Sequence, residues 1–298
     1  MAKVLGIMHK RLMIFLLLGI GTKAHSQLQE STFKLEYLLS PAGSNNTGMS
    51  KTGLKNTSVF NVRKLKVENT ASVDSYQFTY PVNFNLDAEE LGGIYNFSEK
   101  VDLGYPLSEK WELHADFGVA LVSTLGSKIT EQDFVYTGGS YLKRGLGNGK
   151  ASHITLGVGY YTFFGKPEIY PVFSYYGEIS DNFSVEIGFP STVLNYNFNE
   201  KACLKATLDF NGIYANLSNP VNADWENSAQ KAELYKTSLG LDYNYELDES
   251  WSFNLGAGYL LNNEYNLLDR KNNNIFSVNT ASQPFFTTGI KFNLKTKP

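Results

Sequence analysis

The stretch Tyr105–Leu121 reads Y-P-L-S-E-K-W-E-L-H-A-D-F-G-V-A-L and joins a short polar turn to a long alternating segment. Ser108, Glu109 and Lys110 form the turn, and Trp111 opens a run in which every second residue is apolar. Alternation with a period of two residues predicts a β-strand with one apolar face. The run exceeds the ~5–6 residues of an average strand and suits the ~9–11 residues of a tilted strand that crosses a bilayer.

The same turn occurs three more times along the chain. Each copy has an apolar residue, then Ser, Asn or Asp, then an acid and a polar residue, and three of the four close on an aromatic. The copies are Leu107–Trp111, Ile179–Phe183, Phe198–Ala202 and Leu247–Trp251. A side-chain oxygen at the first turn position can accept hydrogen bonds from the backbone of its own turn. The pattern therefore predicts a repeated hairpin in which this residue caps the turn.

Alternation extends over most of the chain after residue 26. The segments between polar or glycine-rich connections predict fourteen strands: 32–40, 57–67, 75–86, 94–107, 111–124, 133–146, 151–164, 167–178, 182–189, 191–198, 202–215, 231–247, 251–262 and 284–295. Alternate connections of an up-and-down arrangement share a side. The four repeated turns and Gly147–Lys150 then share one side, and the long connections 41–56, 216–229 and 262–283 share the other. Because two central strands are short, twelve is the alternative count.

The long strands and the aromatics beside the turns favour a membrane barrel over a soluble β-sandwich. A sandwich has no reason to place large aromatics at turn mouths, whereas a barrel holds them at the membrane–water interface. The predicted interface aromatics are Tyr105, Trp111, Phe183, Tyr196, Tyr245 and Trp251. We expect an all-β fold, a transmembrane up-and-down antiparallel β-barrel of about fourteen strands, with its short turns on the periplasmic side of a Gram-negative outer membrane.

Residues 1–26 have the order of a secretory signal peptide. Lys3, Lys10 and Arg11 precede an apolar run over residues 12–21, and Ala24-His25-Ser26 supplies the small residues of a cleavage site. The apolar run is too short for the ~20 residues of a spanning helix. We predict that cleavage leaves a single barrel domain, residues 27–298.

The charge balance and the scarcity of cysteine and histidine exclude several kinds of partner. Of the 26 Lys and Arg residues, four lie in residues 1–26, so the mature chain has 22 basic and 29 acidic residues and a net charge of −7. An acidic chain is a poor partner for nucleic acid. Cys203 is the one cysteine, and His114 and His153 are the histidines left after cleavage, which disfavours disulfides and Cys/His metal sites. We expect neither a metal nor a cofactor.

The mature chain resembles the outer-membrane β-barrel families of unknown function from Bacteroidota-type Gram-negative bacteria. The signal peptide, the repeated turns, the Gly–aromatic strands and the closing strand Phe286–Leu294 carry the resemblance. Such families are similar in fold to porin-like barrels, which implies outer-membrane lipid and the barrel assembly machinery as partners. One departure is the C-terminus, where Asn-Leu-Lys-Thr-Lys-Pro follows Phe292 in place of a terminal aromatic.

Charged side chains occupy the strand faces opposite the apolar ones. The predicted lumen-lining residues are Glu112, His114, Asp116, Lys205, Asp209 and Lys291. Such charges either line an aqueous pore and tune its ion preference, or pair with one another and fill the lumen. His114 is the best catalytic candidate because Glu112 and Asp116 flank it on the same face. We expect instead a hydrogen-bonded lumen histidine, because the pattern points it inward and only three residues from the turn.

These features predict a location and a shape but no substrate. Our first hypothesis is a non-enzymatic, porin-like barrel that passes or binds small solutes in a polar lumen. The alternatives are an outer-membrane acyl hydrolase, or a structural or surface-interaction barrel that acts through the long loops 216–229 and 262–283.

Overall fold

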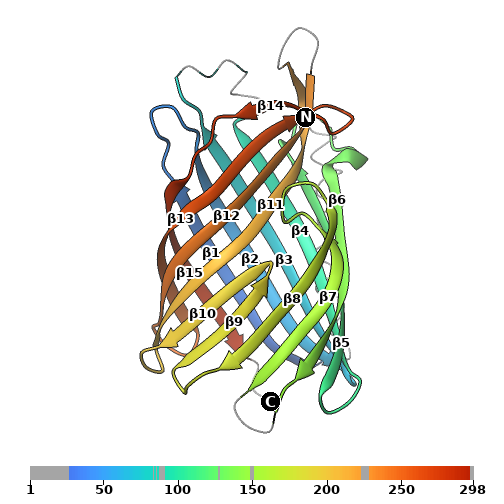
Figure 1. Cartoon of the computed structure of the whole chain (residues 1–298), viewed down its shortest axis with the longest axis vertical. Coiled ribbons are helices and arrows are strands. Elements are labelled where there is room, and N and C mark those ends of the chain that lie inside the picture. The colour runs from blue at the N-terminus through green and yellow to red at the C-terminus, as the bar shows by residue number, and fades with distance from the viewer. Residues whose placement is uncertain are drawn as a thin grey trace.

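A computed structural model describes residues 27–82, 84, 86, 91–126, 128–147, 151–222 and 228–295. These residues form a closed, up-and-down antiparallel β-barrel whose wall has 14 strands (Figure 1). The predicted fold class and the higher of the two strand counts are therefore confirmed. No helix among the described residues is long and apolar enough to cross a membrane. The predicted signal peptide lies outside the described residues.

Each wall strand pairs with its neighbours in chain order. The wall consists of β1 (Gln27–Ser40), β2 (Gly48–Val62), β3 (Leu65–Thr79), β4 (Gly93–Pro106), β5 (Trp111–Ser123), β6 (Phe134–Gly145), β7 (Ser152–Tyr161), β8 (Glu168–Glu178), β9 (Phe183–Phe189), β10 (Ser191–Asn197), β11 (Ala202–Asn222), β12 (Ser228–Glu246), β13 (Trp251–Leu268) and β15 (Gln283–Lys295). Strand β15 pairs with both β13 and β1 and so closes the barrel. The short strand β14 (Asn274–Val278) pairs with β13 outside the wall.

The turn between β2 and β3 lies at Arg63 and Lys64, inside the segment 57–67 that the sequence predicted as one strand. The predicted boundaries of the second and third strands are therefore wrong. This turn contains no Gly, Pro or Asn to mark it, and Arg63 itself adopts the left-handed conformation, with φ 56°. The error leaves the strand count unchanged, because β2 begins at Gly48, well before the predicted start.

The predicted long loops 216–229 and 262–283 are also largely wrong. Strands β11, β12 and β13 continue through much of these segments and pair with one another beyond the rest of the wall, for example Asn216 with Lys231 and Lys231 with Leu268. These segments are rich in Asn, as loops are. Their backbone N–H and C=O groups are nevertheless paired between neighbouring strands, so the strands continue through them. We call this end of the barrel the loop end and the opposite end the turn end (Figure 1).

The four repeated turns all lie at the turn end, and three of them are capped as predicted. The side chain of Ser108 accepts a hydrogen bond from the Trp111 amide at 3.2 Å, Asn199 accepts one from Ala202 at 3.0 Å, and Asp248 accepts one from Trp251 at 2.8 Å. The backbone amides of Ser250 and Trp251 donate to the Asp248 carboxyl and hold its pKa below the usual value. Side-chain caps thus explain the residue type at the first position of these turns.

The wall extends least far along the barrel axis at β9 and β10, which have seven residues each; we call this part the low wall. Beyond them, β11 approaches the end of β5, and Asn216 pairs with Ser123 in a parallel bridge. In the turn-end half of the wall, strands β6 to β10 separate β5 from β11. The barrel is therefore narrower at the loop end than at the turn end.

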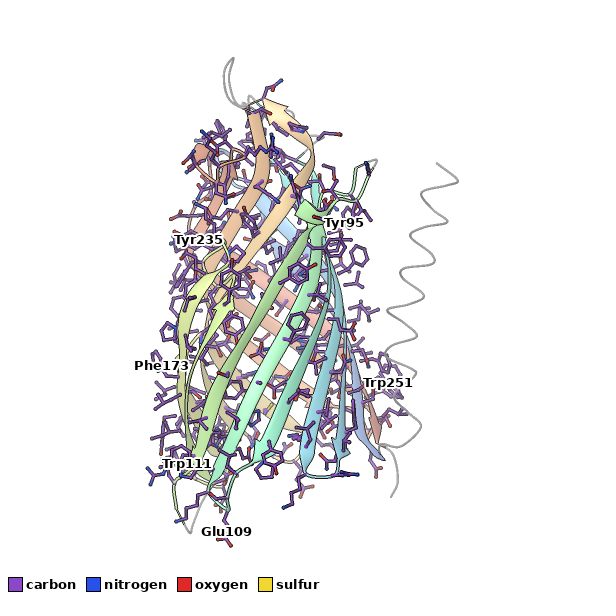
Figure 2. All side chains as sticks on the ribbon, turned by 90° about the vertical axis from the view of Figure 1, so that its right-hand side faces the viewer. Tyr95, Glu109, Trp111, Phe173, Tyr235 and Trp251 are labelled. Carbon is purple, nitrogen blue, oxygen red and sulfur yellow. The ribbon has the colours of Figure 1, made fainter. Side chains whose placement is uncertain are left out.

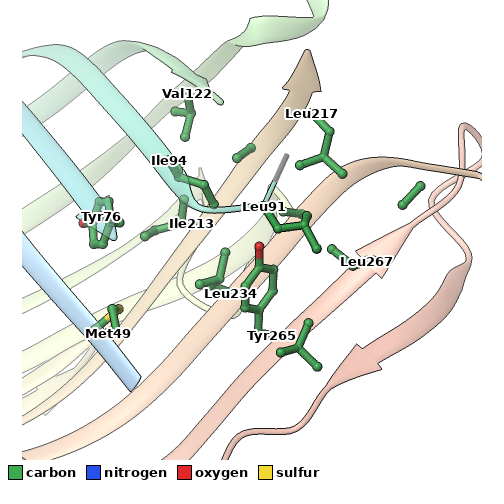
Figure 3. Close-up of a cluster of buried hydrophobic side chains, with 14 of the residues drawn as sticks. Met49, Tyr76, Leu91, Ile94, Val122, Ile213, Leu217, Leu234, Tyr265 and Leu267 are labelled. Atoms are coloured by element: carbon green, nitrogen blue, oxygen red, sulfur yellow. The ribbon is translucent and has the colours of Figure 1, made fainter. Parts of the chain in front are cut away.

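Apolar side chains fill the interior of the loop end (Figure 3). We call this cluster the apolar plug; among its members are Met49, Tyr76, Leu91, Ile94, Val122, Ile213, Leu217, Leu234, Tyr265 and Leu267. The side chains come from β2, β3, β4, β5, β11, β12 and β13 and from the segment before β4, and they point toward one another. The plug closes the lumen at this end by side-chain packing.

Candidate functional site: a polar cavity in the lumen

Alternation separates an outer, apolar face of the barrel from an inner, polar one. On β5 the outward positions include Leu113 and Phe117, both exposed, while His114 and Asp116 point into the lumen. The remaining predicted lumen residues occupy the inward positions of their strands. Lys205 pairs with Asp242 across β11 and β12, Asp209 lies opposite Ser191 and Ser238, and Lys291 lies opposite Lys34.

A cavity of about 420 Å³ lies in the lumen against β4 to β10. Its lining combines charges of both signs, hydroxyl groups and aromatic rings: Lys100, His114, Asp116, Tyr141, Lys143, His153, Thr155, Tyr161, Phe163, Val172, Ser174, Glu186, Phe189, Pro190 and Ser191. Of the six predicted lumen residues, the structure brings His114 and Asp116 into this cavity and places Glu112 beside His114. Lys205, Asp209 and Lys291 do not belong to its lining.

His114 is held by carboxylates and an aromatic ring. Its Nδ1 lies 2.9 Å from Asp102 and its Nε2 lies 3.3 Å from Glu112, while its ring stacks on Tyr141 with centroids 4.7 Å apart. The Tyr141 hydroxyl donates to the second oxygen of Asp102 at 2.6 Å. Both ring nitrogens therefore have acidic partners, an arrangement that fixes the ring in the lumen and does not resemble a nucleophile–base pair.

Asp116 is the most deeply buried charge of the cavity, with 1% of its side chain exposed. The Tyr161 hydroxyl donates to Oδ2 at 2.5 Å, and the Lys100 ammonium lies 3.5 Å from Oδ1. The second distance is an ion pair without a close hydrogen bond, so Oδ1 is a buried acceptor without a hydrogen bond among the described residues. Lys100 is therefore the group that balances the charge of Asp116 at the wall of the cavity.

Other lumen charges pair away from the cavity. Lys51 lies 3.0 Å from Asp74, and Lys34 forms an ion pair with Glu36 on the same strand. The Thr287 hydroxyl donates to Asp242 at 3.0 Å. Among the described residues, no group of three or more His, Cys, Asp or Glu side chains could hold a metal ion.

The loop between β7 and β8, residues 162–167, covers the low wall. Thr162 donates to the carbonyl oxygen of Gly212 at 3.3 Å, and the amide of Lys166 donates to Glu233 at 3.0 Å. A Cβ atom built on Gly212 would lie 2.0 Å from the Thr162 carbonyl oxygen, so this close approach requires glycine. The loop therefore spans the gap above β9 and β10 and rests on β11 and β12.

Aromatic rings join this loop to the rim of the cavity. Phe163 lies 5.4 Å from Phe189, and Phe164 lies 5.6 Å from Phe210 and 6.0 Å from Tyr235, measured between ring centroids. Phe163 and Phe189 also line the cavity. The cavity thus has a charged inner wall and an aromatic rim.

The predicted interface aromatics occupy outward positions next to the turns, as Figure 2 shows for Trp111 beside Glu109. The Arg144 guanidinium lies 5.2 Å from the centre of the Trp111 ring, and Trp251 packs against Phe292 with ring centroids 4.7 Å apart. Tyr105, Tyr196 and Trp251 are exposed, whereas Phe183 and Tyr245 are half-buried. Tyr196 pairs with Phe183 across β9 and β10. Their contact with lipid headgroups stays a prediction.

Lys100, Tyr141 and Tyr161 belong to the site although sequence analysis did not single them out. Their signal is the cross-strand register, which places Tyr141 opposite His114 and Lys100 opposite Gly118. Tyr161 reaches Asp116 from β7, two strands away from β5. Only a correct register between strands would have grouped these residues.

Comparisons with solved structures find β-barrels of the outer membrane. The porin NanC matches with a TM-score of 0.41 at 10% identity, covering 89% of this chain and 100% of that one. An outer membrane channel from Pseudomonas putida F1 matches at 0.42 and 11%, covering 90% and 95%. The outer membrane phospholipase A from Escherichia coli matches at 0.37 and 10%, covering 91% and 93%. Similarities at this level assign neither a substrate nor an activity to this chain.

The sequence comparisons are more specific about family. None of the curated proteins matches the chain. Residues 77–294, from the end of β3 to the end of β15, match a family described as a domain of unknown function, DUF6268. The match covers most of the barrel wall and the whole lumen cavity, and the chain therefore belongs to the DUF6268 family.

Proposed function

We propose that this protein is a porin-like barrel of the outer membrane that binds small polar solutes in its lumen cavity and lets them pass. The observation that carries the proposal is the cavity of about 420 Å³, lined by charges of both signs inside a closed barrel. Export through a cleaved signal peptide, residues 1–26, belongs to the same proposal. So does the assignment of the turn end to the periplasm and the loop end to the outside, which is the usual arrangement of such barrels.

The cavity lining supports solutes that carry polar groups. Lys143 and His153 can donate hydrogen bonds to a solute, and Glu186 can accept them. The volume suits a small molecule, since ligand pockets span about 300–1,000 Å³. The aromatic rim at Phe163 and Phe189 suits a solute that also has an apolar part.

The apolar plug makes passage along the barrel axis indirect. The loop 162–167 covers the rim of the cavity at the short strands β9 and β10. Solutes would enter the cavity from the turn end, and passage through the loop end would require movement of this loop or of the plug. A porin with a permanently open axial pore would instead show a large and steady conductance.

Reconstitution into planar bilayers tests the proposal. We expect a small, measurable conductance from the folded barrel, and a shift of the reversal potential toward cation preference in Lys143→Glu under a KCl gradient. Lys110→Glu, an equal charge change in an exposed turn, is the matched control and should shift the potential much less. A folded, heat-modifiable barrel that carries no current and admits no sugars or amino acids into liposomes would contradict the proposal.

A further inference from the structure

The outer face of the barrel is apolar on most strands. On β5 its outward positions are Leu113, Ala115, Phe117, Val119 and Leu121, which suit a hydrocarbon environment. Strands β1 to β4 differ, because several of their outward positions are polar. We call this group the outer polar patch; it consists of Ser31, Asn56, Ser58, Asn69 and Glu99.

The cross-strand register establishes that these side chains point outward. Glu99 pairs with Val119 on β5 and with Ala71 on β3, and Ala71 pairs with Asn56 on β2. Its neighbours Ser98 and Lys100 point inward, where Ser98 bonds to Ser72 and Lys100 lines the cavity. The patch therefore lies on the surface that faces the membrane.

The patch also lies deep in the apolar band. Along β4, Glu99 is six residues from Tyr105 at the turn end and four residues from Tyr95 toward the loop end. At ~3.3 Å per residue and a strand tilt of about 40°, these separations correspond to about 15 Å and 10 Å along the barrel axis. The apolar band of such barrels is about 25 Å tall, so Glu99 lies near its middle.

Contacts within the patch satisfy only part of its polar groups. The Asn69 amide donates to Glu99 Oε1 at 3.1 Å. The Asn56 amide donates to Ser31 at 3.1 Å and to the Thr32 carbonyl oxygen at 3.2 Å, so Glu99 and Asn69 are the members that keep unused capacity. A carboxylate can accept about four hydrogen bonds, and among the described residues Glu99 accepts one, from Asn69. Lipid chains offer no donors, so a carboxylate with a single donor at this depth is unfavourable.

We propose that the outer polar patch is a self-association interface, covered in the membrane by the same patch of a second copy of this chain. A two-fold interface brings a surface against itself, which requires that the surface be self-complementary. The Asn69 amide uses one of its two hydrogens within its own copy, so its second hydrogen can donate to Glu99 of the other copy. Lipid headgroups cannot reach the middle of the bilayer, which leaves a protein surface as the occupant.

Ala71 supports close approach of two copies. It lies on the outer face between Asn56 and Glu99 and is exposed. A small side chain at the centre of the patch lets two strands approach closely enough for the flanking polar groups to meet, as small residues do between membrane helices. This inference concerns the outer face of β1 to β4 and is independent of solute passage through the lumen.

Cysteine cross-linking in intact membranes tests the interface. In a Cys203→Ser background, Ala71→Cys should give a covalent homodimer on oxidation. The matched control is Ala257→Cys, on the outer face of β13, six residues from the turn-end residue Trp251 just as Ala71 is six from Leu65. We expect at least tenfold more dimer from position 71, and loss of that excess when Glu99→Leu and Asn69→Leu are added.

Several outcomes would overturn the proposal. Equal cross-linking at positions 71 and 257 would indicate random collision, and an adduct of Ala71→Cys with a different protein would indicate another partner. Absence of dimer from a barrel that still shows heat-modifiable migration would exclude the interface. If Ala71→Cys fails to fold, Val73→Cys replaces it, because Val73 is exposed on the same face of β3.

Discussion

Tyr265 offers the most direct test of the apolar plug. Its side chain is 2% exposed, its ring centroid lies 4.9 Å from that of Phe78, and its hydroxyl lies 3.4 Å from the Tyr80 hydroxyl. Burial of about 200 Å² of aromatic surface at about 25 cal/mol per Å² corresponds to about 5 kcal/mol. Measured losses for replacement of large buried aromatics by alanine are about 3–5 kcal/mol. We therefore expect Tyr265→Ala to lower the free energy of unfolding by about 3–5 kcal/mol.

Tyr265→Phe is the matched control, because it keeps the ring and removes the hydroxyl. The contact at 3.4 Å is long for a hydrogen bond between hydroxyls, so its loss should change the free energy of unfolding by about 0.5 kcal/mol. Urea unfolding of the barrel in lipid vesicles measures both variants. Conductance gives a second readout, because the space opened in the plug should raise the current of the Ala variant and leave that of the Phe variant unchanged. Equal effects of the two substitutions on stability would refute the packing of this ring.

Three further changes test other parts of the barrel. Trp111→Ala should reduce the fraction of heat-resistant, inserted barrel by an amount equivalent to about 1–2 kcal/mol, because it removes an interface aromatic and its contact with Arg144. The conductance of the folded fraction should stay normal. Normal insertion with lost conductance would contradict this placement. The His114→Ala variant and the unchanged protein should show the same level of lipid hydrolysis. A lipase activity that is present in the unchanged protein and absent from this variant would establish the acyl-hydrolase alternative. Burial raises the pKa of Asp133, but hydrogen bonds from Ser123, Thr130 and Asn216 outweigh it and lower that pKa overall, so the stabilisation from Asp133 is complete above about pH 4 and is lost as the pH falls further. Protease cleavage near the loop end should therefore increase in acid, and Asp133→Asn should remove this dependence on pH.

Most of the turn-end half of the fold was predictable because the local signals agree with one another; the exception is the unmarked turn at Arg63 and Lys64. Alternation, the capped turns and the aromatics beside them all indicate the same strands, and the caps at Ser108, Asn199 and Asp248 have the expected geometry. At the loop end, alternation and residue composition no longer predict the same structure. Ile213 and Leu234 are apolar residues at positions that should be polar if the lumen were wet, and their role is evident only once the plug is seen.

The site was partly predictable for a similar reason. The inward positions of His114 and Asp116 follow from alternation along one strand. Their partners Tyr141 and Tyr161 depend on the register between strands, which alternation alone does not determine. Glu99 did carry a signal, because a charged residue at an apolar position of β4 breaks the period of two.

The bridge between β5 and β11 has a consequence for how the barrel is made. Ser123 and Asn216 are 93 positions apart in the chain, whereas consecutive wall strands form hairpins from neighbouring segments. Contacts between distant segments are slow to form, because a long loop must close before they are made. Hairpins can therefore add one after another along the wall, whereas the narrow loop end can form only after β11 has joined the sheet. The lumen is then sealed late in folding, after most of the surrounding wall exists, and a substitution at this bridge should delay closure of the loop end more than assembly of the turn-end wall.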